Sequence, residues 1–362
     1  MKAQRTRSIA FYLPQFHQIP ENDQWWGPGF TEWTNTRKAR ARFAGHQQPS
    51  SPGELGYYDL RSPETRAAQA ELAGAHGIDA FCYYHYWFNG HRLLHEPFDA
   101  VLASGEPDFP FVLCWANENW TRAWNGSDRD VLMEQHYSDA DDVDHLRHLA
   151  AAFADPRYVR VDGKPLFLVY RAARLPDARR TTDLWRAEAS RLGIGELFLA
   201  RVESFSTERG DPRPGGFDAA IEFQPQWRQI RSSVVRSAAR RVTQQFGSTR
   251  FDRPYNTFDY STLVERALRA PVPDYPRSPC VTPRWDNSPR RESGAVILTG
   301  STPEAYGEWV TRTLAAHEPD LLFVNAWNEW GEGAHLEPCK RWGRAYLEAH
   351  RNAVATHLAT TP

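Results

Sequence analysis

The stretch that decides the fold is LLFVNAWNEWGEG, residues 321–333, in which an apolar run opens into two acidic residues framed by tryptophans and glycines. Its first four residues are short, apolar and rich in strand formers, so they predict a buried strand that ends in a loop. The two glycines disfavour a continuing helix and let the backbone turn tightly. We therefore expect Glu329 and Glu332 to face one space beyond the end of this strand.

Two carboxyl groups in one pocket can divide the roles of acid and base. Trp327 and Trp330 would desolvate the carboxyl group that they cover and raise its pKa, while hydrogen bonds, for example from Asn328, would keep the other ionised. An acid and a base are the requirement for breaking a glycosidic bond, so the stretch predicts a site that cleaves sugars. The alternative is that both acids are ordinary loop residues paired with Arg341 or Arg344.

Length and composition agree with an enzyme that binds an uncharged ligand. A chain of 362 residues with 41% hydrophobic content can bury a large core. The formal net charge is -2, which excludes the chain as a whole as an electrostatic partner of nucleic acid or of an anionic membrane. The 14 Trp, 14 Tyr and 19 Phe exceed what such a core needs, and flat rings with a polar edge suit the faces of sugar rings.

Apolar, strand-like runs alternate with helical segments along the whole chain, which predicts a parallel sheet. About eight strands that close on themselves give our predicted fold, a single α/β domain over residues 1–362 built as a (β/α)8 barrel with long strand-end loops. A doubly wound open sheet is the competitor, but no Gly-x-Gly-x-x-Gly follows the first strand and no phosphate loop is present. The predicted strands are 9–14, 80–87, 111–116, 166–170, 197–202, 219–223, a weaker one at 280–285, and 321–326; the predicted helices are 63–76, 141–154, 181–192, 303–316 and 342–357.

Polar and aromatic residues gather directly after the predicted strands. Because the carboxyl ends of barrel strands form the rim that carries the active site, we expect these residues to bind a sugar, although the histidines among them also fit a purely structural role in the rim. The extended segment 20–52 after the first strand predicts either a wall of the cleft or a structural cap. The substrate-binding candidates are Tyr12, Gln15, His17, Trp33, His85, Tyr86, Trp87, Asn117, Asn119, Trp120, Arg122, Trp124, Trp327, Asn328 and Trp330.

Glu118 is a second-choice catalytic residue. Asn117 and Glu118 follow a predicted strand in the same way as Asn328 and Glu329, and paired strand-end glutamates serve many barrel glycosidases. A separation of about 5 Å between two such acids would suit a direct nucleophile, and one of about 6.5–9.5 Å an inverting enzyme. The other interpretation of Glu118 is hydrogen bonding to sugar hydroxyls or to Arg122.

The remaining features of the sequence indicate a cytoplasmic protein without a metal or cofactor. The apolar segment near the amino terminus is too short for a signal peptide, and no run is long enough to span a membrane. The four cysteines are widely scattered, so we expect buried, reduced thiols and neither a disulfide framework nor a zinc site. They are Cys82, Cys114, Cys280 and Cys339.

Five motifs together carry a resemblance to a known group of proteins. They are FYLPQFH (11–17), GFTEW (29–33), CYYHYWF (82–88), WANENW (115–120) and WNEWGEGAHLE (327–337). With these motifs the chain resembles WbsX-type proteins, which are related to glycoside hydrolase family 99, from about residue 8 to about residue 350. The resemblance implies a (β/α)8 barrel and a retaining endo-α-mannosidase or α-mannanase chemistry without a metal.

The resemblance also implies a role for each acid of the 327–337 motif. Glu329 would act as the base on the 2-hydroxyl of the substrate and Glu332 as the acid on the leaving oxygen. The 2-hydroxyl then attacks C1, so no carboxylate needs to reach C1. Gly331 departs from the family pattern, which has a larger, polar residue there, and this puts the leaving-group subsite and the substrate in question.

The same resemblance associates the chain with the synthesis of bacterial surface polysaccharides such as lipopolysaccharide O-antigen. The expected substrate is an oligosaccharide or a lipid-linked glycan, and the arginine-rich segment 228–253 could meet the membrane-held carrier, or else be a solvated helix face. Three functions stay open: a retaining glycosidase or transglycosylase on α-mannoside-like linkages, a biosynthetic glycosyltransferase, and a noncatalytic glycan-binding protein.

Overall fold

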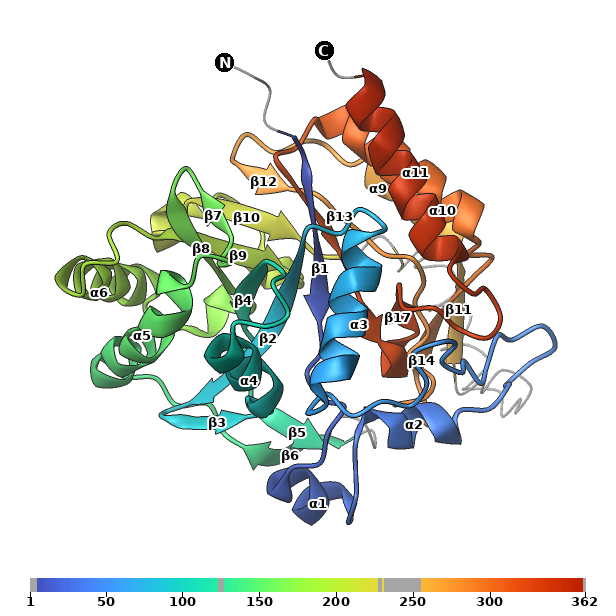
Figure 1. Cartoon of the computed structure of the whole chain (residues 1–362), viewed down its shortest axis with the longest axis horizontal. Coiled ribbons are helices and arrows are strands. Elements are labelled where there is room, and N and C mark those ends of the chain that lie inside the picture. Colours follow the sequence, from blue (N-terminus) through green and yellow to red (C-terminus); the bar gives the residue numbers. More distant parts are fainter. Residues whose placement is uncertain (1–4, 123–126, 227–229, 231–254, 361–362) are drawn as a thin grey trace, which may run out of the picture.

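The computed structural model describes residues 5–122, 127–226, 230 and 255–360. Its centre is a barrel of parallel strands with helices around it (Figure 1). The strand order along the sheet is β12-β10-β9-β8-β4-β2-β1-β15-β13. These strands are β1 Arg7–Tyr12, β2 Ala80–Phe88, β4 Phe111–Trp115, β8 Lys164–Val169, β9 Phe198–Glu203, β10 Ala219–Glu222, β12 Arg277–Ser278, β13 Cys280–Val281 and β15 Leu321–Val324.

The sheet closes through a strand that changes partner at Pro279. Before this proline β12 pairs with β10, with Ala220 opposite Arg277, and after it β13 pairs with β15, with Cys280 opposite Phe323. The two short pieces therefore act as one seventh strand between β10 and β15. This confirms the predicted (β/α)8 barrel, although the weak strand predicted at 280–285 is shorter and begins earlier.

Helices cover the outside of the barrel, and side-chain caps fix where several of them begin. Ser62, Ser138, Asp177 and Thr302 each accept a hydrogen bond from the backbone N–H of the third residue of the helix that follows. The helices between the barrel strands, and after the last of them, are α3 Pro63–Gly74, α4 Glu96–Ser104, α5 Asp139–Ala154, α6 Ala178–Arg191, α9 Tyr260–Leu268, α10 Pro303–His317 and α11 Ala345–Thr360.

Several smaller elements, with α4 and α9, were not predicted from the sequence. Two short helices fold the 20–52 segment, and together with the β5–β6 hairpin they lie at the end of the barrel toward which β1 points (Figure 1). The smaller elements are α1 Pro20–Trp26, α2 Glu32–Lys38, β3 His91–Leu93, β5 Trp120–Arg122, β6 Ser127–Met133, β7 Arg160–Val161, η2 Ala172–Arg174, η3 Ser206–Glu208, η4 Arg213–Gly215, β11 Tyr255–Asp259, β14 Ala295–Thr299, β16 Asn328–Glu329, η6 Trp330–Glu332 and β17 Ala334–His335.

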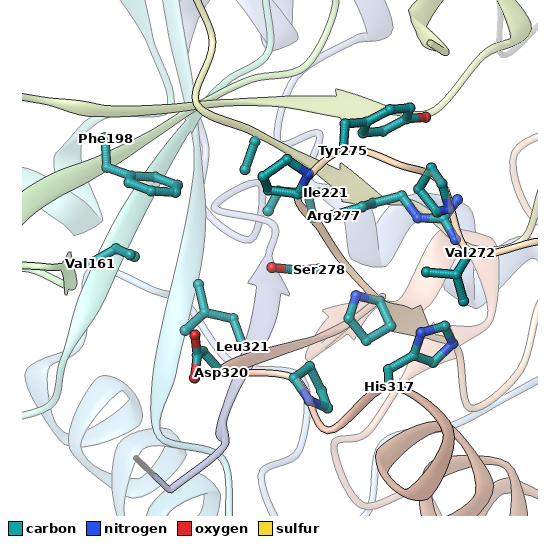
Figure 2. A pocket seen from close by; sticks show the side chains of 15 residues that line it. Val161, Phe198, Ile221, Val272, Tyr275, Arg277, Ser278, His317, Asp320 and Leu321 are labelled. Carbon is teal, nitrogen blue, oxygen red and sulfur yellow. The ribbon is translucent and has the colours of Figure 1, made fainter. Parts of the chain in front are cut away.

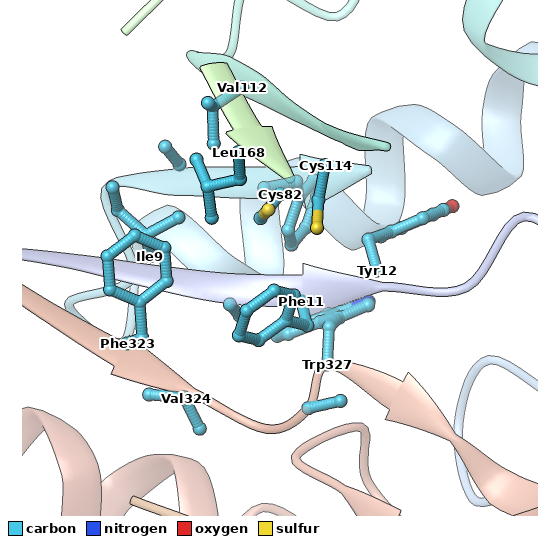
Figure 3. Packing of buried hydrophobic residues seen from close by; sticks show 14 of the residues in the cluster. Ile9, Phe11, Tyr12, Cys82, Val112, Cys114, Leu168, Phe323, Val324 and Trp327 are labelled. Carbon is cyan, nitrogen blue, oxygen red and sulfur yellow. The ribbon is translucent and has the colours of Figure 1, made fainter. Parts of the chain in front are cut away.

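The hydrophobic core fills the barrel and the layer between strands and helices. Figure 3 shows side chains of several strands meeting there, and the rings of Phe11 and Phe323 lie 5.6 Å apart between the neighbouring strands β1 and β15. Every residue of β4 is buried, as expected for a parallel strand covered on both faces. The four cysteines are free and buried, as predicted for their thiols. None of the described helices combines the length and apolar character that crossing a membrane requires.

Candidate active site

The segment after β15 folds back on itself and presents both predicted acids. β16 pairs with β17 in antiparallel fashion, and η6 makes the turn between them. Gly333 ends this turn with a φ of 62°, and a Cβ there would lie 3.1 Å from the backbone and side chain of Asp286, so the position favours glycine. Glu329 and Glu332 therefore flank one tight turn at the carboxyl end of the barrel.

One guanidinium group joins the two acids. Arg290, in the segment between β13 and β14, bonds Glu329 through Nη2 at 2.9 Å and Glu332 through Nη1 at 2.9 Å. The Glu329 side chain is 7% exposed and the Glu332 side chain 24% exposed, so only Glu332 retains substantial contact with solvent. The two carboxyl groups share a site, as predicted, but their arginine is neither Arg341 nor Arg344.

Burial increases the proton affinity of the Glu329 carboxyl group. The pKa of Glu329 is raised from 4.5 to about 8, mainly by burial and further by the nearby carboxylates of Glu332 and Glu32, against the attraction of Arg290. The surroundings of Glu329 thus favour its protonated form more than those of an exposed carboxyl group would. The sequence predicted that burial would separate the two acids, and the structure assigns the raised pKa to Glu329.

Glu32 is a site residue that the sequence analysis missed. It begins α2, is fully buried, and accepts a hydrogen bond from Arg290 Nε at 2.8 Å. Its carboxylate occupies the space above Gly331, since a Cβ on this glycine would lie 1.7 Å from Glu32 Oε1. Gly331 is thus the residue that admits Glu32, because it has no side chain.

A buried hydrogen-bond network supports the turn that carries Glu329 and Glu332. Glu337 accepts hydrogen bonds from Trp330 Nε1 at 2.6 Å, from Tyr58 at 2.8 Å and from Gln69 at 2.6 Å. Asn328 makes two hydrogen bonds with the backbone of Leu13, at 2.7 and 3.0 Å, which tie the turn to the segment after β1. Trp330 and Asn328 are therefore structural supports, whereas the sequence analysis expected them to contact substrate.

Two of the predicted substrate-binding residues form a half-exposed aromatic ledge at the same end of the barrel. The ring of Trp120, on β5, lies 5.1 Å from Tyr86 and 5.7 Å from Trp25 of α1. All three side chains keep part of their surface open. Burial, and then the charge of Glu329, raises the pKa of Tyr86, so the Tyr86 end of the ledge lies within the electrostatic reach of Glu329.

Glu118 lies on the rim but is not joined to the acid pair. It forms an ion pair with Arg171, which also bonds the buried Glu208 at 3.1 Å. Burial raises the pKa of Tyr170, after β8, and the charges of both Glu118 and Glu332 raise it further, so Glu118 faces the same end of the barrel. Its side chain is 40% exposed. Glu118 remains a candidate for substrate contact, with Arg171 as its partner in place of the expected Arg122.

Several predicted substrate contacts face the helix layer or the core, which differs from the expectation. On β2, His85 bonds His145 at 2.9 Å and Trp87 donates to Asp141 at 2.9 Å, so both point toward α5. Tyr12 is buried on the α3 side, where its hydroxyl donates to Gln69 at 2.7 Å. These rings cannot stack on a ligand in the barrel mouth.

Other candidates are enclosed within the loop layer. Trp33 is 4% exposed and donates to the carbonyl of Tyr58 at 2.7 Å. The side-chain amide of Asn117 donates to the backbone carbonyl of Arg171 and accepts a hydrogen bond from its backbone N–H. The remaining enclosed candidates are Gln15, His17 and Trp327, which are 2%, 0% and 0% exposed. Their part in substrate binding stays a prediction.

A few predictions fall at the edge of the described chain. Asn119 is exposed and accepts a hydrogen bond from the Gln135 backbone at 2.9 Å. Arg122 lies in β5, but its side chain, together with Trp124 and the segment 228–253 except Ile230, lies outside the described residues. The membrane-contact prediction for that segment stays a prediction.

A cavity of about 270 Å³ opens at the opposite end of the barrel (Figure 2). It lies where strands begin, since Phe198, Ala219 and Leu321 are the first residues of β9, β10 and β15. Active sites of barrels lie at the carboxyl ends of the strands, and the acid pair is there. This cavity is therefore separate from the candidate active site.

Comparisons with known proteins agree with the fold and add the family. The chain is 45% identical over 352 residues to uncharacterized WxcX proteins of two strains of Xanthomonas campestris pv. campestris, a match that covers 96% of this chain and 49% of each relative. The chain thus spans about half the length of these curated relatives.

Solved structures with the same fold include a family 99 endo-α-mannosidase from Bacteroides thetaiotaomicron, with a TM-score of 0.60, 12% identity and 98% coverage of both chains. A glycoside hydrolase-like protein matches with a TM-score of 0.61 and 15% identity over 98% of this chain and 95% of its own. The family model described as glycosyltransferase WbsX matches residues 8–350. The chain therefore belongs to the WbsX glycosyltransferase family.

Proposed function

We propose that this chain is a retaining glycosidase or transglycosylase that acts on α-mannoside-like linkages of a bacterial surface polysaccharide or its lipid-linked precursor. The observation that carries the proposal is the acid pair itself. Glu329 and Glu332 lie on one turn at the carboxyl end of a barrel, with different exposure and a common cation. Two acids on one turn suit a reaction in which neither has to attack the sugar from the opposite face.

The first step uses the substrate's own 2-hydroxyl group. Glu329 takes the proton of this hydroxyl, its oxygen forms a bond to C1, and the bond from C1 to the leaving oxygen breaks. Glu332 gives its proton to the leaving oxygen, so the step is balanced and yields a 1,2-anhydro sugar. This attack on C1 requires that the 2-hydroxyl group of the substrate is trans to the leaving group, as in α-mannosides.

The second step opens the strained ring. Glu332, now ionised, takes a proton from water or from an acceptor hydroxyl, whose oxygen attacks C1 as the bond from C1 to O2 breaks. Glu329 returns its proton to O2, and both acids regain their starting states. Two inversions at C1 give net retention, and the choice between water and an acceptor separates hydrolysis from transfer.

The aromatic ledge supports a carbohydrate substrate. Tyr86, Trp120 and Trp25 offer half-exposed rings beside the acids. Apolar rings with polar edges pack against the C–H faces of sugars and leave the hydroxyl groups free for hydrogen bonds. A sugar held on this ledge would lie within reach of Glu329.

A biosynthetic glycosyltransferase is the second candidate function. It is favoured by the description of the matching family, and the same acids would then activate an acceptor. Such an enzyme needs an activated sugar donor, for which the sequence carries no common nucleotide-binding motif. A noncatalytic glycan-binding protein is the third candidate. The pairing of Glu329 and Glu332 with the same arginine, Arg290, argues against it.

Turnover by matched variants tests the proposal. The parent, Glu329→Gln and Glu332→Gln are incubated with free and lipid-linked surface oligosaccharides, with and without nucleotide sugars, and the products are followed by mass spectrometry. We expect donor-independent cleavage or glycan transfer that falls by about 10²–10⁴-fold in both variants. Glu308→Gln on α10, whose side chain is 69% exposed, is the control and should retain full activity.

Each alternative gives a distinct result in the same experiment. Sugar addition that requires the donor would assign the protein to the transferases. Glycan binding that survives Glu329→Gln, in a parent without turnover, would make it a binding protein.

A further inference from the structure

The guanidinium group of Arg290 forms ion pairs with three carboxylates. Its Nε, Nη2 and Nη1 atoms bond Glu32, Glu329 and Glu332 at 2.8, 2.9 and 2.9 Å. The arginine side chain is 9% exposed, so these contacts form with little water nearby. A planar guanidinium group can hold several acceptors in fixed directions, which a lysine cannot do.

The segment that carries Arg290 is itself held by the loop after β1. Arg42 donates to backbone carbonyl oxygens of the segment 288–292, two of them at 2.8 and 3.0 Å. Four residues before Arg290, Asp286 accepts hydrogen bonds from His46 and Gln48, both at 2.8 Å. The same loop supplies Glu32, so the guanidinium is fixed both at its tip and along its backbone.

Charge in this cluster is unbalanced. One cation faces three acids, and burial disfavours every uncompensated charge, so the cluster favours the retention of a proton by one of the acids. Glu329 is more buried than Glu332, and its raised pKa favours the proton on Glu329. The reaction needs the opposite arrangement, with the proton on Glu332, so the balance between the two acids decides how much enzyme is ready to react.

The groups that face Glu329 come from four elements or segments. They are Arg290 from the segment after β13, Glu32 from α2, Glu332 from η6, and Tyr84 and Tyr86 from β2.

We propose that Arg290, anchored by Glu32, is the positioning residue of this site: it orients both acids and determines which of them carries their shared proton. The inference rests on the proposed function for its catalytic meaning. Arg290 stabilises the ionised form of Glu329, whereas Glu32 opposes that form by its own charge. Removing the two charges therefore has opposite effects on Glu329, which a purely structural role for the cluster would not produce.

Direct titration of Glu329 tests the inference without any need for turnover. The protein is labelled with carboxyl-13C glutamate, and the Glu329 signal is assigned by its loss in Glu329→Gln. NMR spectra are recorded from acidic to alkaline pH for the parent, Glu32→Gln and Arg290→Met. Arg157→Lys is the control, because Arg157 pairs with Asp155 at 2.7 Å in an equally buried place away from the site. Circular dichroism verifies the fold of each variant.

The expected result is a lower titration midpoint for Glu329 in Glu32→Gln, a higher one in Arg290→Met, and no change in Arg157→Lys. If Arg290→Met does not fold, the direction of the shift in Glu32→Gln decides alone. Midpoints that do not move, or that move in the same direction in both variants, would overturn the inference. Absence of turnover in the parent would instead refute the proposed function and leave this titration to decide on Arg290.

Discussion

Adding one methyl group at Gly331 should break the contact between α2 and the acid pair. A Cβ at this position would lie 1.7 Å from Glu32 Oε1 and 2.7 Å from Arg290 Nε, far inside van der Waals contact. Both partners are buried and bonded to each other, so neither can move aside without losing its ion pair. In Gly331→Ala, Glu32 must move away from Arg290, the cation that it pairs with in the described residues.

The expected loss of stability follows from that separation. Breaking a buried ion pair costs about 3–5 kcal/mol, and the gain from replacing glycine in the unfolded chain offsets about 0.5–1 kcal/mol of it. We therefore expect a decrease of about 3 kcal/mol in the free energy of unfolding. With an unfolding entropy of about 2.1 cal/mol/K per residue over 362 residues, this lowers Tm by about 4 °C.

Calorimetry and denaturant titration measure this loss, and two further variants test whether the clash with Glu32 is its cause. Gly74→Ala makes the same chemical change where the Cβ meets only Phe109 at 3.6 Å, and it should not lower Tm. In a Glu32→Ala background only the contact with Arg290 Nε at 2.7 Å remains, so the second substitution should cost clearly less than it does in the parent. An equal cost of Gly331→Ala in both backgrounds would refute the reasoning, because the clash with Glu32 would then not be its cause.

The other predictions concern the ledge, the core and pH. Trp120→Ala should raise KM for the glycan about threefold to tenfold, through loss of a stacking contact, whereas Trp87→Phe should leave KM unchanged because this indole faces α5; steady-state kinetics compare them. Tyr12→Phe should lower the free energy of unfolding by about 1 kcal/mol with kcat unchanged, as denaturant titration and kinetics will measure. Because the pKa of Glu329 is raised from 4.5 to about 8, its contribution to stability is complete below about pH 4.5 and is lost as pH rises through 8. Thermal melts across this range should show that decline, and Glu329→Gln should make it shallower.

Most of the barrel could be predicted because parallel strands covered on both faces are continuous apolar runs. The runs at 111–116 and 321–326 begin at the residues where β4 and β15 begin. The seventh strand was weak in the sequence because Pro279 divides it into two pieces of two residues each. The helices α4 and α9 have nine residues each, which gives a weak signal in the sequence, and helices this short depend on the barrel for their stability.

The direction of strand side chains could not be predicted for the same reason. Successive residues of a strand point to opposite faces, but when both faces are buried the apolar pattern does not identify the lumen. On β2, Tyr84 and Tyr86 lie within reach of the charge of Glu329, whereas His85 and Trp87 bond to α5. The sequence made His85, Tyr86 and Trp87 equally plausible contacts, and only the tertiary fold separates them.

The arrangement of the acids depends on which strands are neighbours. β1 and β15 are adjacent, with Arg7 opposite Leu321, so the segments that follow them meet above the barrel although they lie about 300 residues apart in sequence. The loop after β1 thereby reaches Glu329 and Glu332 by way of Arg290. Glu32 and Arg290 are separated by 258 positions, so no local spacing could reveal their contact. A substitution in the loop after β1 should therefore alter the reactivity of the two acids in the loop after β15. Gly331, between the acids, and Glu32, in α2, thus form one functional unit.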